Sequence, residues 1–172
     1  MLEALDRLGL RENTVVMFTS DHGDMQGSQG LINKGLPWEE SSHIPLVVRT
    51  PGGAQGAVVD DLVSGVDFFA TCVDYAEMPT EPSVEGDSFA SMIAEPTKTL
   101  NRPIFSEMKP WCMVREGAFK LVVQKEGFKV SHLFDLENDP YEMDNLLDKP
   151  EHTEVQKRLF GVLQAWYERV SN

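Results

Sequence analysis

The sequence predicts an α/β fold, in which a piece of α/β sheet is followed by a small antiparallel sheet of about four strands with a packed C-terminal helix. Two observations lead to this prediction. Before residue 100, amphipathic helical segments alternate with short, continuously apolar runs, which are typical of strands buried on both faces of a parallel sheet. After residue 100, short strand-like segments follow one another with glycine-containing turns between them, as in an antiparallel meander. We therefore divide the chain into residues 1–100 and 101–172.

Composition limits the classes of function. The 172 residues are 41% hydrophobic, which is ordinary for a globular protein. The formal net charge of −13 disfavours nucleic-acid and anionic-membrane partners, because both favour positive charge. No apolar stretch is long enough to span a membrane, and no signal peptide is recognisable, so the sequence assigns no compartment. Two cysteines are too few for a disulfide framework.

The first part begins with a short helix and contains two strands. Leucines recur every three residues in 2–8 and Gly9 follows them, which predicts a helix that ends at a glycine. Residues 15–19 form an apolar, β-branched run, and residues 44–49 form a second one that Pro51 and the next two glycines terminate. We expect both runs to be buried strands of the parallel type.

A second helix is expected after Asp67, which we predict to be its N-terminal cap, with Pro79 and Pro82 closing it. Because Cys72 lies on the apolar stripe of this helix, we expect it to be a core thiol. The predicted stripe consists of Phe69, Cys72, Val73 and Ala76.

The second part contains strand candidates and one long helix. The helix is predicted to start at Pro150 and Glu151, because proline is favoured in the first helical turn. The strand candidates are 104–106, 112–115, 119–123 and 132–136. The apolar face of the helix consists of Val155, Leu159, Val162, Leu163, Trp166 and Val170.

Residues 19–24 (Thr-Ser-Asp-His-Gly-Asp) begin where the first apolar strand ends, and a long glycine-rich loop follows. Ligands of open α/β sheets bind at the carboxyl ends of strands. Asp21 and His22 carry the carboxylate and imidazole groups that bind metals in proteins. The alternative is that Asp21 caps a turn and His22 is a surface histidine. Asp24 is a further candidate ligand or a loop cap.

Several motifs follow this one in order. They are a G-x-x-G at 27–30, Lys-Gly at 34–35, Trp-Glu-Glu-Ser at 38–41, Pro-Leu-Val-Val-Arg at 45–49, the helix pattern of 63–79, and Asp-Leu-Glu-Asn-Asp-Pro-Tyr-Glu at 135–142 with Asn-Leu after it. Together with residues 19–24, this series resembles the later signature regions of the sulfatases, in the alkaline phosphatase superfamily. The resemblance covers nearly the whole chain and implies the C-terminal part of an alkaline-phosphatase-like α/β sheet.

The resemblance implies roles for three residues. Asp21 would be a carboxylate ligand of a divalent cation, and His22 would bind or border the same cation beside the substrate. Lys34 would donate to a sulfate oxygen and neutralise charge as the ester bond breaks. His22 and Lys34 are thus the candidate catalytic and substrate-binding residues. We expect Ca²⁺ first, with Mn²⁺, Mg²⁺ or Zn²⁺ as alternatives. A solvated loop lysine is the other interpretation of Lys34.

Neighbouring residues are expected to support this site. Adjacent residues in an extended chain point in opposite directions, so we predict orienting and capping roles for Glu39 and Glu40 rather than paired acid–base chemistry. His43 is expected to be structural. Trp38 is the tryptophan that we place near the site.

The mechanism of the sulfatases depends on residues that this sequence lacks. They hydrolyse esters with a formylglycine made in a C-x-P-S-R-type motif, and a paired Asp-Asp also binds their metal. Neither Cys72 nor Cys112 lies in such a motif. We therefore expect the C-terminal segment of a metal-dependent sulfatase, inactive alone, whose substrate would be a small sulfate ester if an N-terminal part completes it.

Three alternatives stay open. The first is a phosphonate or phosphate ester hydrolase of the same superfamily. The second is a non-catalytic relic or interaction module whose exposed sheet is covered by a second copy or a partner. The third is a generic acidic metal-binding domain. Choline-type, aryl and carbohydrate sulfates are all compatible with the sequence.

Overall fold

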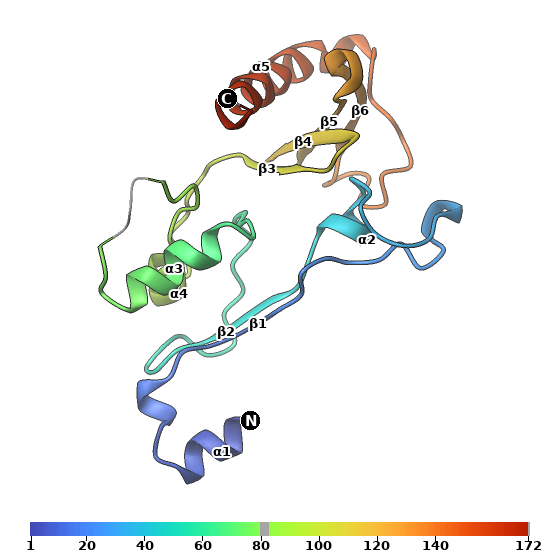
Figure 1. Ribbon diagram of the computed structural model, residues 1–172. Coiled ribbons are helices and arrows are strands. Elements are labelled where there is room, and N and C mark those ends of the chain that lie inside the picture. Colours follow the sequence, from blue (N-terminus) through green and yellow to red (C-terminus); the bar gives the residue numbers. More distant parts are fainter. Residues whose placement is uncertain (80–82, 172) are drawn as a thin grey trace. The chain divides into compact units, whose positions relative to one another are not determined.

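The computed structural model describes residues 1–79 and 83–171, which form two compact units (Figure 1). The first unit consists of Met1–Asp21 and Ile44–Asn101. The second consists of His22–His43 and Arg102–Asn172. The long loop that follows the first strand therefore belongs to the same unit as the C-terminal sheet.

The first unit contains the two predicted strands and its helices. Its elements are α1 (Leu2–Arg7), the 3₁₀ turn η1 (Arg11–Asn13), β1 (Val16–Thr19), β2 (Leu46–Arg49), α3 (Asp67–Tyr75) and α4 (Ala90–Ala94). Helix α1 ends where predicted, and Gly9 follows it with a φ of +67°, the left-handed conformation in which glycine commonly ends helices.

The predicted parallel arrangement of the first two strands is wrong. β1 and β2 lie side by side and pair antiparallel, with Phe18 opposite Val47 (Figure 1). A continuous apolar run indicates where a strand can be buried, but it does not fix the direction of its neighbour. Direction depends on the connection between the strands, and the connecting segment His22–His43 belongs to the second unit. Phe18 and Val47 are 65% and 62% exposed, so these strands are not buried within this chain.

Helix α3 forms as predicted, but a different face of it is buried. Pro82, one of the two prolines expected to close it, lies outside the described residues. Asp67 is not its N-cap; the side chain is buried and accepts hydrogen bonds from the backbone N–H groups of Ser64 and Asp87, at 2.6 and 3.0 Å. Thr71 is also buried, and its Oγ1 accepts a hydrogen bond from the backbone N–H of Phe89. These polar contacts turn the helix so that Cys72 is exposed. The predicted core thiol is therefore wrong within this chain.

The second unit contains the predicted four-stranded antiparallel sheet, in the order β3-β4-β5-β6 (Figure 1). Its strands are β3 (Ile104–Glu107), β4 (Trp111–Glu116), β5 (Phe119–Gln124) and β6 (Lys129–Asp135), with the 3₁₀ turn η3 (Glu126–Phe128) between the last two. Each consecutive pair of strands is antiparallel. The meander is therefore confirmed.

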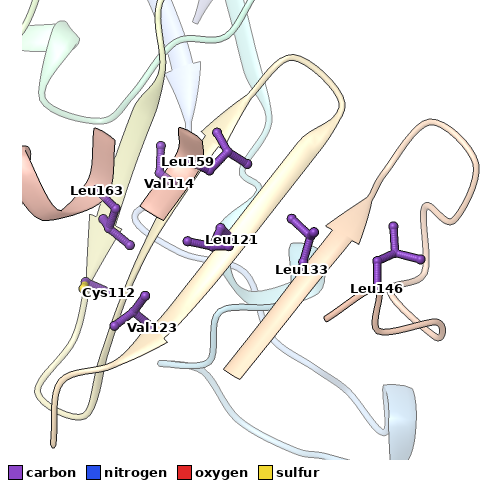
Figure 2. Close-up of a cluster of buried hydrophobic side chains, with 8 residues drawn as sticks. All are labelled: Cys112, Val114, Leu121, Val123, Leu133, Leu146, Leu159 and Leu163. Atoms are coloured by element: carbon purple, nitrogen blue, oxygen red, sulfur yellow. The ribbon is translucent and has the colours of Figure 1, made fainter. Parts of the chain in front are cut away.

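Helix α5 (Thr153–Val170) packs on one face of this sheet and follows the 3₁₀ turn η4 (Pro150–His152). Leu159 and Leu163 are fully buried, which confirms the predicted apolar face, and Trp166 stacks on Phe105 with ring centroids 4.8 Å apart. Figure 2 shows the cluster that the helix and sheet enclose. It consists of Cys112, Val114, Leu121, Val123, Leu133, Leu146, Leu159 and Leu163.

The other face of the sheet carries the alternate residues of the same strands, because successive side chains of a strand point to opposite faces. Trp111, Met113 and Val122 form a second buried cluster there. The segment His22–His43, with the 3₁₀ turn η2 (Ser28–Gly30) and the short helix α2 (Glu39–Ser42), contacts this face. For example, the indole N–H of Trp111 donates to the carbonyl of Gly35 at 3.0 Å. The sheet thus has a helix on one face and the motif-bearing loop on the other.

Among the described residues, no helix is both long and apolar enough to cross a lipid bilayer.

Candidate functional site

The structure brings two of the three predicted site residues together. The Nζ atom of Lys34 lies 2.6 Å from Nε2 of His22. The other ring nitrogen, Nδ1, lies 2.7 Å from the carbonyl oxygen of Gly23. Because a carbonyl oxygen only accepts, Nδ1 carries the proton, and the lone pair of a neutral imidazole is then on Nε2. The ammonium group of Lys34 donates to that lone pair.

The backbone around His22 is held by a close approach to α2. The N–H of Gly23 donates to the carbonyl of Ser41 at 2.9 Å. A Cβ atom at position 23 would lie 2.0 Å from the carbonyl oxygen of Glu40, which is far inside van der Waals contact. Glycine is therefore required after His22 for the chain to pass α2 at this distance.

Ser41 connects the two sides of the site. It is 4% exposed, and its carbonyl contacts the residue after His22. Its hydroxyl oxygen accepts hydrogen bonds from the backbone N–H groups of Gly35 and Leu36, at 3.0 and 3.3 Å. One buried serine thus fixes the backbone next to His22 and the backbone next to Lys34.

An ion cluster fixes α2 to the sheet; it consists of Glu39, Arg115, Lys120 and Glu142. Lys120 is fully buried, and its ammonium group donates to Oε1 of Glu39 at 2.9 Å and to the carbonyl of Pro37 at 2.8 Å. It also forms an ion pair with Oε1 of Glu142. The three hydrogens of the ammonium group therefore have three oxygen partners.

The other members complete the ion cluster. Arg115 donates to Oε2 of Glu39 at 2.7 Å. Oε2 of Glu142 accepts a hydrogen bond from the backbone N–H of Glu39, also at 2.7 Å. Two cations thus face two carboxylates, as the low polarity of a protein interior requires.

The two carboxylates have pKa values shifted in opposite directions. Burial would raise the pKa of Glu39, but the hydrogen bond from His43 and the charges of Lys120 and Arg115 outweigh it and hold this pKa at about 2. Burial raises the pKa of Glu142, and the opposing effect of Lys120 is smaller there. The difference follows the charged partners, because His43, Lys120 and Arg115 all lower the pKa of Glu39, whereas Glu142 has Lys120 as its cation and its pKa is also raised by the charge of Glu39.

The remaining predicted residues have defined places. Asp21 is exposed at the end of the first unit, and the hydroxyl of Ser20 lies 3.4 Å from its Oδ1. Asp24 accepts a hydrogen bond from the backbone N–H of Gln26. This contact agrees with the loop-capping role that was the alternative to metal binding for Asp24. Glu40 accepts from the hydroxyl of Ser28, so neither Glu39 nor Glu40 contacts the other as an acid–base pair.

His43 lies 3.1 Å from Oε2 of Glu39, in agreement with its predicted structural role. The ring of Trp38 packs edge-on against that of His132, with centroids 5.3 Å apart. In the part of the chain that the structure describes, no three His, Cys, Asp or Glu side chains are grouped so that they could hold a metal ion.

Comparison with known proteins decides the family. The family profile described as "N-sulphoglucosamine sulphohydrolase, C-terminal" matches residues 27–169. The chain belongs to this sulfatase family. The match includes Lys34, the ion cluster and all but the last residue of α5, and it confirms the resemblance to the C-terminal part of a sulfatase.

Individual sulfatases are similar to the chain over most of its length. An arylsulfatase of Clostridium perfringens is 33% identical over 163 residues, which are 89% of this chain and 33% of the relative. Arylsulfatase K of Bos taurus is 32% identical, over 98% of this chain and 34% of the relative. The chain therefore spans about a third of the length of the curated sulfatases that it matches.

Solved structures agree with the fold. A protein in complex with its substrate D-glucosamine-2-N,6-O-disulfate superposes with a TM-score of 0.88 at 26% identity, over 97% of this chain and 36% of that protein. The phosphonate monoester hydrolase of Agrobacterium radiobacter superposes with a TM-score of 0.79 over 97% of this chain and 37% of that protein. At 24% identity, the second likeness shows a shared fold.

Sequence reasoning did not find Lys120, Arg115 and Glu142 as members of the ion cluster. One signal was present, because Lys120 interrupts the apolar run Phe119–Gln124 of β5, and a lysine in a buried strand requires an anionic partner. Its partners Glu39 and Glu142 lie in two different sulfatase motifs, so the sequence alone did not indicate which acid is paired.

Proposed function

We propose that the chain is the C-terminal segment of a metal-dependent sulfuric-ester hydrolase, and that Asp21, His22 and Lys34 are its contribution to the active site. The observation that carries this proposal is the 2.6 Å contact between Lys34 and His22, in a chain of the sulfatase family. The contact places the ammonium group of Lys34, which can bind an anion, beside Nε2 of His22, which can bind a metal ion once the ammonium group has moved off its lone pair.

Asp21 and His22 fit a divalent cation by their donor chemistry. Asp21 offers exposed carboxylate oxygens, and the Nδ1 contact of His22 leaves Nε2 as its donor atom, from which a bound cation would displace the Lys34 ammonium group. A bound divalent cation would supply positive charge that polarises an oxygen of the ester. Ca²⁺ is our first choice. Mn²⁺ and Zn²⁺ are alternatives because imidazole suits transition metals better than calcium, and Mg²⁺ is an alternative because it binds carboxylate oxygens as Ca²⁺ does. Two side chains are fewer than the six to eight ligands that Ca²⁺ prefers, so we expect weak binding by this chain.

Lys34 would hold the anionic group of the substrate. Its side chain is exposed, and its ammonium group has three hydrogens, of which one is donated to Nε2 of His22 while no metal ion is bound there. The other hydrogens can be donated to sulfate oxygens, where positive charge stabilises the negative charge that develops as the ester bond breaks. The relative solved with a disulfated glucosamine makes a sulfated sugar a suitable first test ligand.

A phosphonate or phosphate ester hydrolase is the second candidate function. The phosphonate monoester hydrolase shares the fold, and a lysine beside a metal-binding histidine would serve a phosphonate as well as a sulfate. Both anions are tetrahedral, so the residues described do not distinguish them.

Isothermal titration calorimetry with Ca²⁺ and with Mn²⁺ tests the metal part of the proposal. We expect a measurable heat of binding that is lost in the Asp21→Ala and His22→Ala variants. Asp24→Ala is the matched control, because this neighbouring carboxylate caps the loop at Gln26 and should not affect binding. Equal heats in all three variants would show that the cation binds elsewhere.

The anion part is tested separately, with inorganic sulfate and with a sulfated monosaccharide added to the metal-loaded chain. We expect Lys34→Met to weaken binding by at least tenfold, while Lys149→Met, which removes an exposed lysine paired with Asp144, leaves it unchanged. Equal binding by Lys34→Met would remove Lys34 from the site.

A further inference from the structure

We propose that the ion cluster is a positioning device, which sets the Lys34–His22 contact from within the antiparallel sheet. Lys120 and Glu142 touch neither Lys34 nor His22 in the contacts described above; they act through α2. The consequence for catalysis rests on the proposed function, whereas the geometry of the contact can be tested without it.

The ammonium group of Lys120 is held rigidly within the sheet. Lys120 lies on β5, which is paired with β4 on one side and β6 on the other, and it is 0% exposed. Any movement of its ammonium group away from its oxygen partners would leave a buried charge without compensation. Its three acceptors are therefore held at fixed places relative to the sheet.

The ion cluster attaches the loop that leads into α2 to the sheet. Lys120 and Glu142 hold residues 37–39 at three separate groups. Lys120 binds the carbonyl of Pro37 and the carboxylate of Glu39, and Glu142 binds the backbone N–H of Glu39. Three contacts of different direction fix both the position and the orientation of the first turn of α2. A helix of four residues has little stability of its own, so its geometry depends on such contacts.

Hydrogen bonds connect α2 to the residues that follow His22 and Lys34. Ser41 lies on α2, two residues after Glu39, and its backbone and hydroxyl oxygens accept hydrogen bonds from Gly23 and from Gly35. Gly23 follows His22 in the chain, and Gly35 follows Lys34. A displacement of α2 would therefore move both residues of the contact.

Removal of both ends of the buried ion pair tests this sequence of contacts. The double variant Lys120→Met with Glu142→Met removes one charge of each sign, so no buried charge is left without its partner, and apolar replacement of buried pairs is often tolerated. The matched control is Lys157→Met with Glu154→Met, which removes an exposed ion pair on α5. Far-UV circular dichroism and slow amide exchange in β4 and α5 establish that both variants retain the fold.

Amide hydrogen exchange and the ¹⁵N shift of His22 Nε2 provide the measurements. In the Lys120/Glu142 variant we expect the amides of Gly23, Gly35, Glu39 and Ser41 to exchange at least tenfold faster, and the Nε2 signal of His22 to move away from its wild-type shift. In the control, exchange should stay within twofold. A folded Lys120/Glu142 variant with wild-type exchange and a wild-type Nε2 signal would overturn the proposal.

Ser41→Ala gives an independent test if the double variant does not fold. It removes the hydroxyl acceptor of Gly35 and Leu36 and leaves the ion cluster intact. We expect faster exchange at those two amides, unchanged exchange at Glu39, and a shifted Nε2 signal of His22. An unchanged Nε2 signal would overturn the proposal. Neither measurement needs metal, substrate or turnover, so failure of the proposed function would leave both results interpretable.

Discussion

Lys120 shows how a single side chain can connect two sequence motifs of a sulfatase. One of its partners, Glu39, lies in the Trp-Glu-Glu-Ser motif at 38–41, and the other, Glu142, lies in the late motif at 135–142. A lysine is charged in water and costs several kcal/mol to bury alone, so its place in β5 is stable only while both acids are present. The two acids are therefore required for Lys120 to occupy its buried position.

Lys120→Met alone should destabilise the chain strongly. It leaves Glu142 buried without its cation, and breaking one side of a buried pair typically costs about 3–5 kcal/mol. Urea denaturation followed by circular dichroism measures the free energy of unfolding. Lys149→Met is the control, because its pair with Asp144 is exposed and should contribute less than about 1 kcal/mol. A loss of the same size in both variants would contradict the assigned burial of the pair.

The charge of Glu39 should make stability dependent on acid pH. Its pKa is about 2 in the folded chain and 4.5 is its ordinary value, so its stabilising contribution is complete above pH 4.5 and is lost as pH falls towards 2. The shift corresponds to about 3 kcal/mol, at about 1.4 kcal/mol for each unit of pKa.

Glu39→Gln provides the comparison for this pH dependence. The difference in the free energy of unfolding between wild type and variant should be largest at neutral pH and should shrink between pH 4.5 and pH 2. Urea denaturation at several pH values measures it. A difference that stays constant through this range would show that Glu39 has an ordinary pKa.

Residues in short contiguous motifs could be predicted from the sequence, and those that act across distant segments could not. His22 and Lys34 were chosen from one motif series, and the structure places them in contact. Glu142 is more than a hundred residues from Glu39 in the chain, and nothing in either motif specifies that its carboxylate binds the N–H of Glu39. Such pairings depend on which face of the sheet the loop covers, and this is a property of the folded unit.

At the scale of elements, sequence patterns predicted whether a segment is a helix or a strand better than they predicted which segments it pairs with or packs against. Helix α5 and the four strands of the second unit could be predicted from the spacing of their apolar residues, because these residues pack against one another within the same unit. The direction of β1 and β2, and the buried face of α3, were predicted wrongly. In α3 the buried Asp67 and Thr71 decide the face through hydrogen bonds, which a count of apolar residues does not detect.

The contribution of α5 to stability can be measured at one position. Leu163→Ala removes a fully buried side chain from the cluster in Figure 2 and should cost about 2–5 kcal/mol. Gln164→Ala, on the exposed side of the same turn, should change stability by less than about 0.5 kcal/mol. Thermal denaturation of the two variants measures the difference. Equal melting temperatures would mean that α5 does not form the core described.

At the scale of the whole molecule, the exposed apolar pair of the β1–β2 ribbon bears on association. Phe18 and Val47 are directly opposite each other, and both are mostly exposed. Exposed apolar patches commonly mark contact surfaces. We expect copies of the chain to associate through this ribbon, with Phe18→Ser weakening the association and Tyr141→Ser, an equally exposed aromatic in the second unit, leaving it unchanged. Sedimentation equilibrium measures it, and a strictly monomeric wild type would contradict the expectation.

Catalytic turnover requires more of a sulfatase than binding or stability does. The chain spans about a third of its curated sulfatase relatives, and its sequence contains no C-x-P-S-R motif from which a formylglycine could be made. Asp21, His22 and Lys34 can bind and orient a charged group, but none of them is the nucleophile of the sulfatases. We therefore expect the purified chain to show no hydrolysis of an aryl sulfate above the rate without protein, with either Ca²⁺ or Mn²⁺ present. Metal-dependent turnover that Lys34→Met abolishes would show instead that this chain carries a nucleophile of its own.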